Sequence, residues 1–265
     1  MCRLAAYLGP GLPLSGLISE PPHSLSRQAY APREQLHGNV NVDGTGAVWW
    51  PADRGEAMRY ASESTPWADP NLAHLAPRLT GRMVVAAVRG ATPGMPGGRG
   101  AVAPFLIDGL AIAHNGWVGG FRDGVGADLL RALPAERIAR LEVVTDSTVL
   151  AALLAEAVAT GADLRAAVAD TLAVVRAIVQ THGQTATLNL VVADGDQLVA
   201  SRASVAGLCN SLYVLQDAGA PWDGGTLVAS EPLDDQPWRA VPPDHLLTVT
   251  PQRCRAHPLT PEMTT

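Results

Sequence analysis

The sequence predicts an α+β fold in which antiparallel sheets pack against a separate group of helices. Three observations support this prediction. Short apolar runs separated by turn residues occupy the first half of the chain, two helical patterns follow each other in the middle, and short apolar runs return afterwards. A protein built on a parallel sheet would instead alternate strands and helices along the chain.

The first strand pattern covers residues 3–8, which we expect to form a short buried strand. A turn is predicted over 9–13, a segment rich in Gly and Pro. Residues 20–46 contain many Pro, Gly, Asn and His residues and are predicted to form long loops. The pair Asp43-Gly44 is a predicted turn before a short strand over 47–50.

The next strand signals lie on either side of a glycine-rich segment. An apolar run over 83–88 predicts a strand, and residues 90–100, with five glycines and two prolines, predict a loop. Two short strands over 105–107 and 110–113 are expected to form a hairpin, because Asp108-Gly109 between them is a strong turn signal.

Two helices are predicted over 147–159 and 164–179, because apolar residues recur at helical spacing on one face of each segment. Short strands are predicted after them over 187–193, 197–201, 212–215, 226–229 and 246–249. No internal repeat or linker divides the chain. We therefore expect a single domain over residues 2–258 and a loose C-terminal tail over 259–265.

Composition argues against several kinds of chemistry. The net charge of -6 argues against electrostatic binding to the phosphate backbone of a nucleic acid. All 19 basic residues are Arg, so the chain has no lysine for a Walker A motif, a Schiff base or a pyridoxal phosphate anchor. The seven histidines are scattered and lack the spacing of a metal-binding pair on a helix. No cofactor and no metal are expected.

The chain is also expected to be cytoplasmic. No apolar run approaches the roughly 20 residues that a membrane-spanning helix needs, and the N-terminus lacks the apolar stretch and cleavage site of a secretory signal. The cysteines, Cys2, Cys209 and Cys254, are odd in number and form no CxxC pair, so neither a disulfide framework nor a zinc site is predicted.

Cys2 is the first candidate for catalysis. Met1 is generally removable when the next residue is small, and its removal would leave a thiol and a free α-amino group on one residue. The α-amino group has an unperturbed pKa of about 7.7–8.0, so it can act as the base for its own side chain. The alternative is that Cys2 is a small buried residue of the first strand.

Three further motifs could bind a substrate or stabilise a charge. Arg89 leaves the predicted 83–88 strand into a glycine loop, where a guanidinium can bind a carboxylate through two hydrogen bonds, or form a structural ion pair. Asn115-Gly116, at the end of a hairpin strand, offers two donors for an oxyanion hole, or forms a turn. Asp146 lies just before a predicted helix and is either a ligand or an N-cap.

Together these motifs resemble the class II glutamine amidotransferase family of N-terminal-nucleophile hydrolases. Met1-Cys2-Arg3, Arg89-Gly90-Ala91-Thr92, His114-Asn115-Gly116 and Thr145-Asp146-Ser147 follow that family's order and approximate spacing. Within the family, the chain is most similar to the branch that hydrolyses a γ-glutamyl amide in ergothioneine biosynthesis. That similarity covers most of the chain and includes residues 21–25, 28–33, 92–96, 103–105, 229–235 and 238–239.

The resemblance implies a four-layer αββα sandwich of two antiparallel sheets flanked by helices, and a small-molecule γ-glutamyl substrate. It implies that Cys2 is the nucleophile and that Asn115 and Gly116 stabilise the oxyanion. The implied substrate-binding residues are Arg89 for the α-carboxylate, Asp146 for the α-ammonium, and Thr92 and His114.

Two positions depart from the family pattern. Thr45 stands where an aromatic residue is usual, and Leu4 stands where this branch commonly has His; both can alter substrate contacts near Cys2. The leaving amine of this branch carries a quaternary ammonium group, which favours an aromatic site. The aromatic candidates are Trp49, Trp50, Trp117 and Trp238.

Two other functions remain open at this point. The chain could be a glutaminase subunit that supplies ammonia to a partner synthetase, since it has no synthetase domain of its own. It could also be a catalytically silent binding protein that keeps the fold, although intact Cys2, Arg89, Asn115 and Asp146 argue against this. The sequence does not identify pathway partners.

Overall fold

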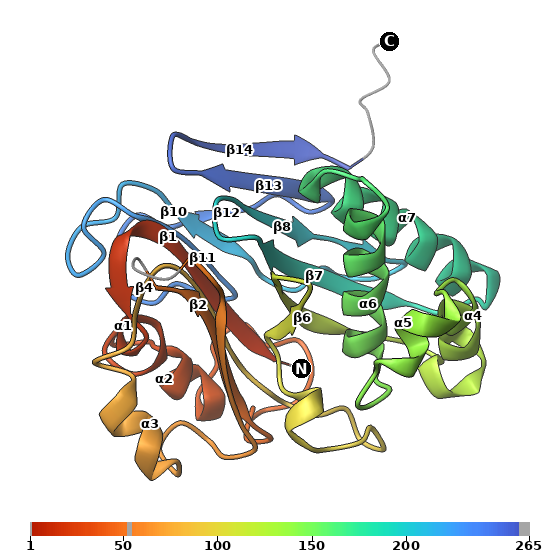
Figure 1. Ribbon diagram of the computed structural model, residues 1–265, viewed down its shortest axis with the longest axis horizontal. Helices are drawn as coiled ribbons and strands as arrows, with labels where there is room; N and C mark the ends of the chain where they lie inside the picture. Colours follow the sequence, from red (N-terminus) through yellow and green to blue (C-terminus); the bar gives the residue numbers. More distant parts are fainter. Residues whose placement is uncertain (1, 52–54, 260–265) are drawn as a thin grey trace.

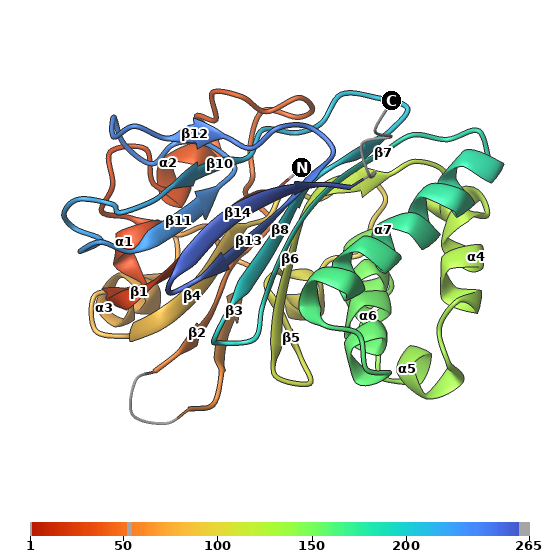
Figure 2. The same cartoon turned by 90° about the horizontal axis from the view of Figure 1, so that it is seen from above.

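Two antiparallel sheets lie face to face in the computed structural model, which describes residues 2–51 and 55–259. One group of helices covers the outer face of the first sheet, and a second group covers the outer face of the second (Figure 1). The view turned by 90° shows the two helical groups on opposite sides of the paired sheets (Figure 2). The predicted α+β class and the αββα layer order are confirmed.

The first sheet has seven strands and places the N-terminal strand at its centre. In spatial order it contains β12 (Arg239–Ala240), β10 (Tyr213–Leu215), β11 (Thr226–Ala229), β1 (Arg3–Pro13), β4 (Thr80–Val88), β2 (Thr45–Trp50) and β3 (Met58–Ser62). Its outer face is covered by α1 (Ser15–Ile18), α2 (Leu25–Tyr30) and α3 (Pro70–Leu75).

The second sheet is built around the predicted hairpins. In spatial order it contains β14 (Arg253–Pro258), β13 (His245–Thr250), β8 (Leu198–Arg202), β7 (Ala186–Ala193), β6 (Leu110–Val118) and β5 (Phe105–Ile107), and β9 (Ser204–Val205) also pairs with β7. Its helices are α4 (Val125–Arg131), α5 (Ala135–Ala139), α6 (Asp146–Ala159) and α7 (Leu164–Thr181). Two 3-10 turns, Arg99–Ala101 and Phe121–Asp123, lie in the connecting loops.

Strand β1 shows why its sequence is a continuous apolar run. Leu4 and Leu8 belong to the apolar cluster that also contains core residues of the second sheet, whereas Ala5 and Tyr7 belong to the cluster under α1–α3. Successive side chains of a strand point to opposite faces. Because both faces of the sheet are covered, residues 4–8 of the strand are apolar without a break, and alternation is lost.

Helices α6 and α7 confirm the predictions over 147–159 and 164–179. Helix α6 is buried along most of its length, because it packs on β5 and β6 and is flanked by α4, α5 and α7. Its N-cap is Thr145, whose side chain accepts a hydrogen bond from the backbone N–H of Thr148 in a capping box. Asp146 is therefore the first helical residue, and its alternative interpretation as the N-cap is wrong.

Several local predictions are corrected by the structure. The turn predicted over 9–13 belongs to β1, which continues past a register shift between Leu8 and Leu12; Gly and Pro are accommodated at such an irregularity. The loop predicted over 20–46 contains α2, which tertiary packing of Leu25 and Ala29 stabilises. His114-Asn115-Gly116 lies inside β6 rather than at its end.

Strand β14 ends at Pro258, and the domain boundary predicted there stays a prediction. Leu259 still donates a backbone hydrogen bond to Asp244 O (2.8 Å). Residues 260–265 lie outside the described residues, so the loose tail stays a prediction. No helix in the described ranges is long and apolar enough to cross a membrane.

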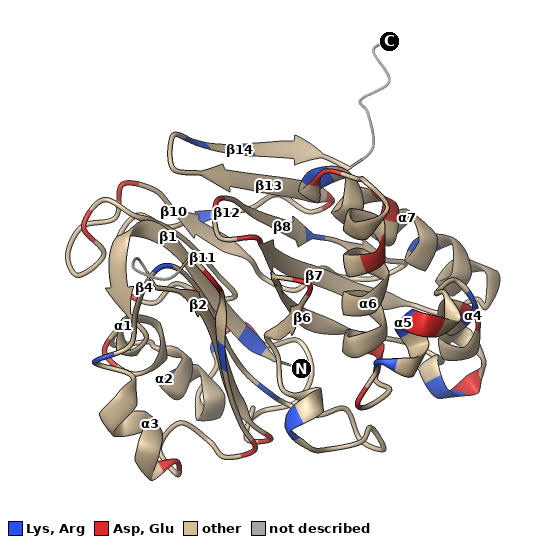
Figure 3. Cartoon of the chain, in the orientation of Figure 1, with Lys and Arg blue, Asp and Glu red and all other residues tan. Residues whose placement is uncertain are grey.

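Charged residues lie mainly on loops, helices and strand ends, whereas the central strands carry few of them (Figure 3). Buried charges are therefore exceptional in this fold. The buried charged residues of the described ranges are Arg3, Asp69, Arg89, Arg137, Asp146 and Glu231. Arg89 and Asp146 line the pocket described next, and Arg3, the residue after Cys2, forms an ion pair with Glu231.

Candidate active site

A small pocket brings together residues that are far apart in the sequence. Strands β1 and β4 are antiparallel, with Arg3 opposite Val88, so the start of β1 lies beside the end of β4. From the second sheet, β6 and the start of α6 complete the pocket. Its lining includes Cys2, Arg89, Thr92, His114, Gly116, Asp146 and Ser147. Six of the seven predicted site residues thus line one pocket.

Arg89 lies at the end of β4 with only 8% of its surface exposed. Its Nη2 donates to the backbone oxygen of Pro96 (2.7 Å), which holds the guanidinium against the glycine-rich loop. Within residues 2–51 and 55–259, no carboxylate forms an ion pair with Arg89, and its Nε and Nη1 have no protein acceptor. The structural ion pair considered for Arg89 is absent there, and part of its donor fork remains available for an anionic ligand.

Asp146 holds the start of α6 against β6. Its Oδ2 accepts a hydrogen bond from Val118 N (3.1 Å), and its Oδ1 accepts from Ser147 N (2.8 Å). The carboxylate is 6% exposed and lies at a helix N-terminus, where the helix dipole favours a negative charge. Asp146 therefore supplies a fixed negative charge to the pocket.

His114 lines the pocket in a neutral form. Its Nε2 lies 3.0 Å from Thr187 O, which can only accept, so Nε2 carries the proton and Nδ1 accepts from Ser147 Oγ (2.9 Å). Burial lowers the pKa of the imidazole, an effect that the Asp146 charge opposes without cancelling. Both nitrogens are engaged by protein groups, so His114 shapes the pocket rather than presenting a free donor.

Gly116 is required by a close approach of two strands. A Cβ at this position would lie 1.8 Å from Thr187 O and 2.4 Å from His114 Nε2, so no side chain fits. The backbone of Gly116 can therefore lie directly against the pocket. Asn115, the preceding residue, does not line the pocket, and its fully buried side chain extends toward Ser230 instead, with Nδ2 3.2 Å from Ser230 Oγ.

A network that the sequence did not reveal fixes the residue after Cys2. The fully buried carboxylate of Glu231 accepts hydrogen bonds from Arg3 Nη1 (3.3 Å) and the backbone N–H groups of Arg33 (2.8 Å) and Glu34 (3.1 Å). The ring of His23 lies 2.7 Å from the same carboxylate through its Nε2. In the sequence, segment 229–235 is notable only for its resemblance to the amidotransferase family. No residue pattern indicates that Glu231 pairs with Arg3, which lies 228 positions away.

We expect this network to make the fold sensitive to acid. Burial by itself raises the pKa of Glu231, but the hydrogen bonds from His23, Arg33 and Glu34 and the charge of Arg3 outweigh it and hold the pKa below the ordinary value of 4.5. A lowered folded pKa contributes stability above the unfolded pKa and loses it as pH falls through the folded value. The melting temperature should therefore fall steeply below about pH 4.5.

Glu231→Gln should cost about 3–5 kcal/mol near neutral pH, because it leaves Arg3 buried without its counter-charge. The gap in stability between parent and variant should shrink as pH falls below 4.5, since the parent loses the same charge by protonation. Denaturant unfolding over a pH series measures this gap, with exposed Glu20→Gln as the control. A gap that stays constant down to acid pH would show that the charge of Glu231 does not stabilise the fold.

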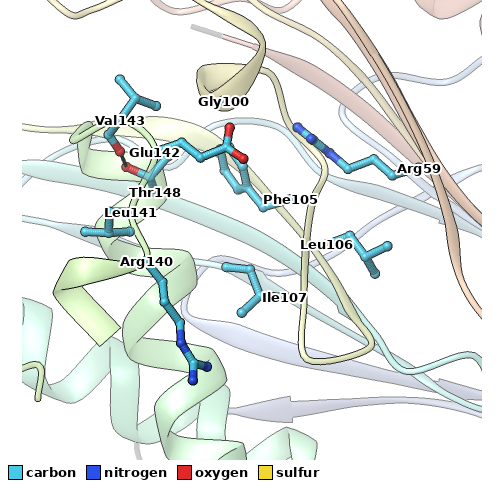
Figure 4. A pocket seen from close by; sticks show the side chains of 10 residues that line it. All are labelled: Arg59, Gly100, Phe105, Leu106, Ile107, Arg140, Leu141, Glu142, Val143 and Thr148. Carbon is cyan, nitrogen blue, oxygen red and sulfur yellow. Dashed lines mark hydrogen bonds between the residues drawn. The ribbon is translucent and has the colours of Figure 1, made fainter. Parts of the chain in front are cut away.

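A second cavity, of about 130 Å³, lies beside the pocket and shares Phe105 with it. Arg59 and Glu142 extend into it from opposite sides (Figure 4). Arg59 donates to the backbone oxygens of Pro104 (2.9 Å) and Val102 (2.7 Å). These bonds hold the loop whose residues Ala101 and Ala103 line the pocket, so Arg59 supports one wall of the site from outside.

The four aromatic candidates differ in their surroundings. Trp49 and Trp50 are buried in the two cores, and Trp238 donates to Asp234 Oδ1 (2.9 Å). Trp117, which follows Gly116, lines an open cavity of about 260 Å³ together with Leu36, His37 and Leu208. The rings of His37 and Trp117 meet edge to face with centroids 6.2 Å apart. Trp117 thus borders an open cavity, and the residue before it, Gly116, lines the pocket.

No group of three or more His, Cys, Asp or Glu residues within the described ranges could hold a metal ion.

Comparison with known proteins links this geometry to one family. Residues 14–263 match the class-II glutamine amidotransferases. The γ-glutamyl-hercynylcysteine sulfoxide hydrolases of Mycolicibacterium smegmatis and Mycobacterium tuberculosis are 38% and 36% identical to the chain, each over 94% of it, and 96% and 93% of their own lengths are covered. The structure of a glutamine aminotransferase class-II domain protein from Silicibacter pomeroyi superposes with a TM-score of 0.71 at 25% identity, over 98% of this chain and 100% of that one.

Proposed function

The chain belongs to the class II glutamine amidotransferase family, and from this premise we propose that it hydrolyses γ-glutamyl-hercynylcysteine sulfoxide and releases glutamate. One observation carries the proposal: the Arg89 guanidinium, which has no ion-pair partner within the described ranges, shares a pocket with Cys2 and the buried Asp146 carboxylate. A γ-glutamyl group carries an α-carboxylate and an α-ammonium, and these two charges match the two side chains.

Binding of the glutamyl group positions the bond to be cut. Arg89 pairs with the α-carboxylate and Asp146 with the α-ammonium, while Thr92 and His114 confine the methylene chain. Fixing both ends places the γ-carbonyl carbon next to the Cys2 sulfur. Such positioning can lower a barrier by several kcal/mol, because the orientation is established before the reaction begins.

The chemical steps conserve protons within the site. With Met1 removed, the α-amino group of Cys2 takes the thiol proton, and the thiolate attacks the γ-carbonyl carbon. Asn115 and the Gly116 N–H stabilise the oxyanion that forms. The C–N bond then breaks, the Cys2 ammonium protonates the leaving amine, and a γ-glutamyl thioester remains. Water, deprotonated by the same amine, attacks the thioester and breaks the C–S bond, which releases glutamate. The Cys2 ammonium then returns its proton to the Cys2 thiolate, and the starting state is restored.

The amine side of the substrate has a matching surface next to the oxyanion position. Hercynine carries a trimethylammonium group, and a quaternary ammonium is attracted to the face of an aromatic ring. Trp117 borders an open cavity directly after Gly116, so it is the aromatic residue that we assign to the leaving amine. Met1 lies outside the described residues, so its removal stays a prediction.

We expect Asp146→Asn to weaken discrimination for the α-ammonium group. The parent should cleave a γ-glutamyl amide about ten- to a hundredfold better than the matching glutaryl amide, which lacks the α-amino group, because a charge-assisted hydrogen bond contributes about 1.5–3 kcal/mol. In Asp146→Asn this ratio of kcat/KM should approach one, whereas Arg89→Lys should raise KM for both amides. An unchanged ratio in Asp146→Asn would show that Asp146 does not bind the α-ammonium and only connects α6 to β6.

A direct comparison of substrates tests the proposed function. Purified enzyme should release glutamate from γ-glutamyl-hercynylcysteine sulfoxide with a kcat/KM well above that for free glutamine. Faster turnover of glutamine would instead favour a glutaminase subunit that feeds a synthetase. Binding of either compound without glutamate release would favour a silent binding protein.

A further inference from the structure

Ser230, which follows β11, is fully buried and connects the nucleophile strand to Asn115. Its Oγ accepts a hydrogen bond from Leu4 N (3.0 Å), and its backbone N–H donates to Leu4 O (2.9 Å). The same Oγ lies 3.2 Å from Asn115 Nδ2. One hydroxyl thus contacts both the strand that begins at the nucleophile and the amide assigned to the oxyanion.

The contact between Ser230 and Asn115 spans the two sheets. Ser230 follows β11 of the first sheet, and Asn115 lies on β6 of the second, so their hydrogen bond lies between the sheets. Leu4 also belongs to the apolar cluster that contains the core residues of the second sheet, not to the one under α1–α3. Because side chains of a strand alternate, Cys2 points to the same face as Leu4. The Asn115 carboxamide therefore lies on the side of β1 toward which the Cys2 thiol points.

Two polar groups in this arrangement lack a hydrogen-bond partner. Asn115 Oδ1 is buried and has no partner among the described residues. The Ser230 hydroxyl accepts from Leu4 and from Asn115 Nδ2, but its own hydrogen has no acceptor there. A hydroxyl supplies one donor and two acceptor positions, and a carboxamide can present either end to it. Rotating the carboxamide by half a turn satisfies both groups at once, since Ser230 O–H then donates to Asn115 Oδ1.

We propose that Ser230 is a positioning residue: its hydroxyl donates to Asn115 Oδ1 and thereby directs the carboxamide N–H₂ toward the oxygen of the scissile carbonyl. This proposal rests on the proposed function of the site. The orientation matters because the two ends of the amide have opposite effects. An N–H stabilises the developing oxyanion, whereas a carbonyl oxygen at the same place would repel it.

Ser230→Ala should lower kcat roughly tenfold to a hundredfold, while KM changes by less than about threefold. This loss of kcat should not exceed the loss caused by removing an oxyanion donor altogether. The matched control is Ser211→Ala. Ser211 is also buried and its Oγ donates to Ser230 O (2.7 Å), but it makes no hydrogen bond to Asn115. An equal loss of kcat in both variants would mean that the effect comes from packing around Ser230, and the proposal would be wrong.

A double-mutant cycle separates action through Asn115 from any other effect of Ser230. If Ser230 acts by orienting the amide, Ser230→Ala should cost almost nothing further in an Asn115→Ala background. If the two losses in kcat multiply, Ser230 acts independently and the proposal is contradicted. A parent enzyme that cleaves no γ-glutamyl amide at all would overturn the proposed function rather than this step.

A measurement on the unaltered enzyme covers the case in which Ser230→Ala does not fold. Neutron diffraction from deuterium-exchanged crystals locates the exchangeable hydrogens. The expected result is one deuteron between Ser230 Oγ and Asn115 Oδ1, with two deuterons on the end of the amide that points away from Ser230. Two deuterons on the amide atom that faces Ser230 would overturn the proposal.

Discussion

Cys2→Ala is expected to lose at least about four orders of magnitude in kcat and to keep its fold. A nucleophile and its base act as a unit, and removing the nucleophile leaves only binding and oxyanion stabilisation. Cys2 is half-buried at the start of β1 and lines the pocket, so its truncation removes few packing contacts. Steady-state hydrolysis and thermal unfolding of the variant check the two parts of this expectation.

The other cysteines provide matched controls. Cys254 lies in β14, where burial raises the pKa of its thiol to about 11, so its reactive thiolate is scarce near neutral pH. Cys209 donates weakly to Ser204 Oγ (3.3 Å), and neither cysteine lines the pocket. Cys209→Ala and Cys254→Ala should retain parent activity. If Cys209→Ala lost turnover without unfolding, Cys209 rather than Cys2 would be the nucleophile.

Enzyme that retains residues ahead of Cys2 is expected to lose most of its activity. In the proposed mechanism the α-amino group of Cys2 is both the base for the thiol and the acid for the leaving amine. An amide nitrogen cannot carry a proton between them, and positioned acid–base catalysis contributes about 10²–10⁴-fold. A variant with a bulky residue inserted after Met1, which blocks Met1 removal, should lose activity on that scale.

Placing a protease site directly before Cys2 provides the control for that variant. Cleavage exposes Cys2 as the N-terminus, and activity should return in proportion to the cleaved fraction measured by intact mass. Full activity before cleavage would contradict the proton-transfer role of the α-amino group, although Cys2 could remain the nucleophile.

The layers of the fold were predictable because their signals are local. Strands β1 and β4 have both faces buried, which gives continuous apolar runs, and α7 is amphipathic. Helix α2 was missed because its six residues depend on packing of Leu25 and Ala29 rather than on a helical pattern of their own. The irregular part of β1 was missed because Gly9 and Pro10 indicate a turn unless the pairing with β4 is known.

The candidate site was predictable where a residue stands next to a recognisable strand or helix end. Arg89 follows β4 and Asp146 begins α6, and both line the pocket with Cys2. The supporting contacts were not predictable, since the bonds of Glu231 to Arg3 and of Ser230 to Asn115 join segments more than a hundred residues apart. No periodicity or spacing within either segment encodes its partner.

The central claim is that Cys2 carries the γ-glutamyl group between the two halves of the reaction. Rapid acid quenching during turnover of γ-glutamyl-hercynylcysteine sulfoxide, followed by intact-mass and peptide mass analysis, tests it most directly. We expect a chain that begins at Cys2, with a fraction that is heavier by one glutamyl group. The added mass should map to the N-terminal peptide and should be absent in Cys2→Ala. A glutamyl group on any residue other than Cys2 would contradict it.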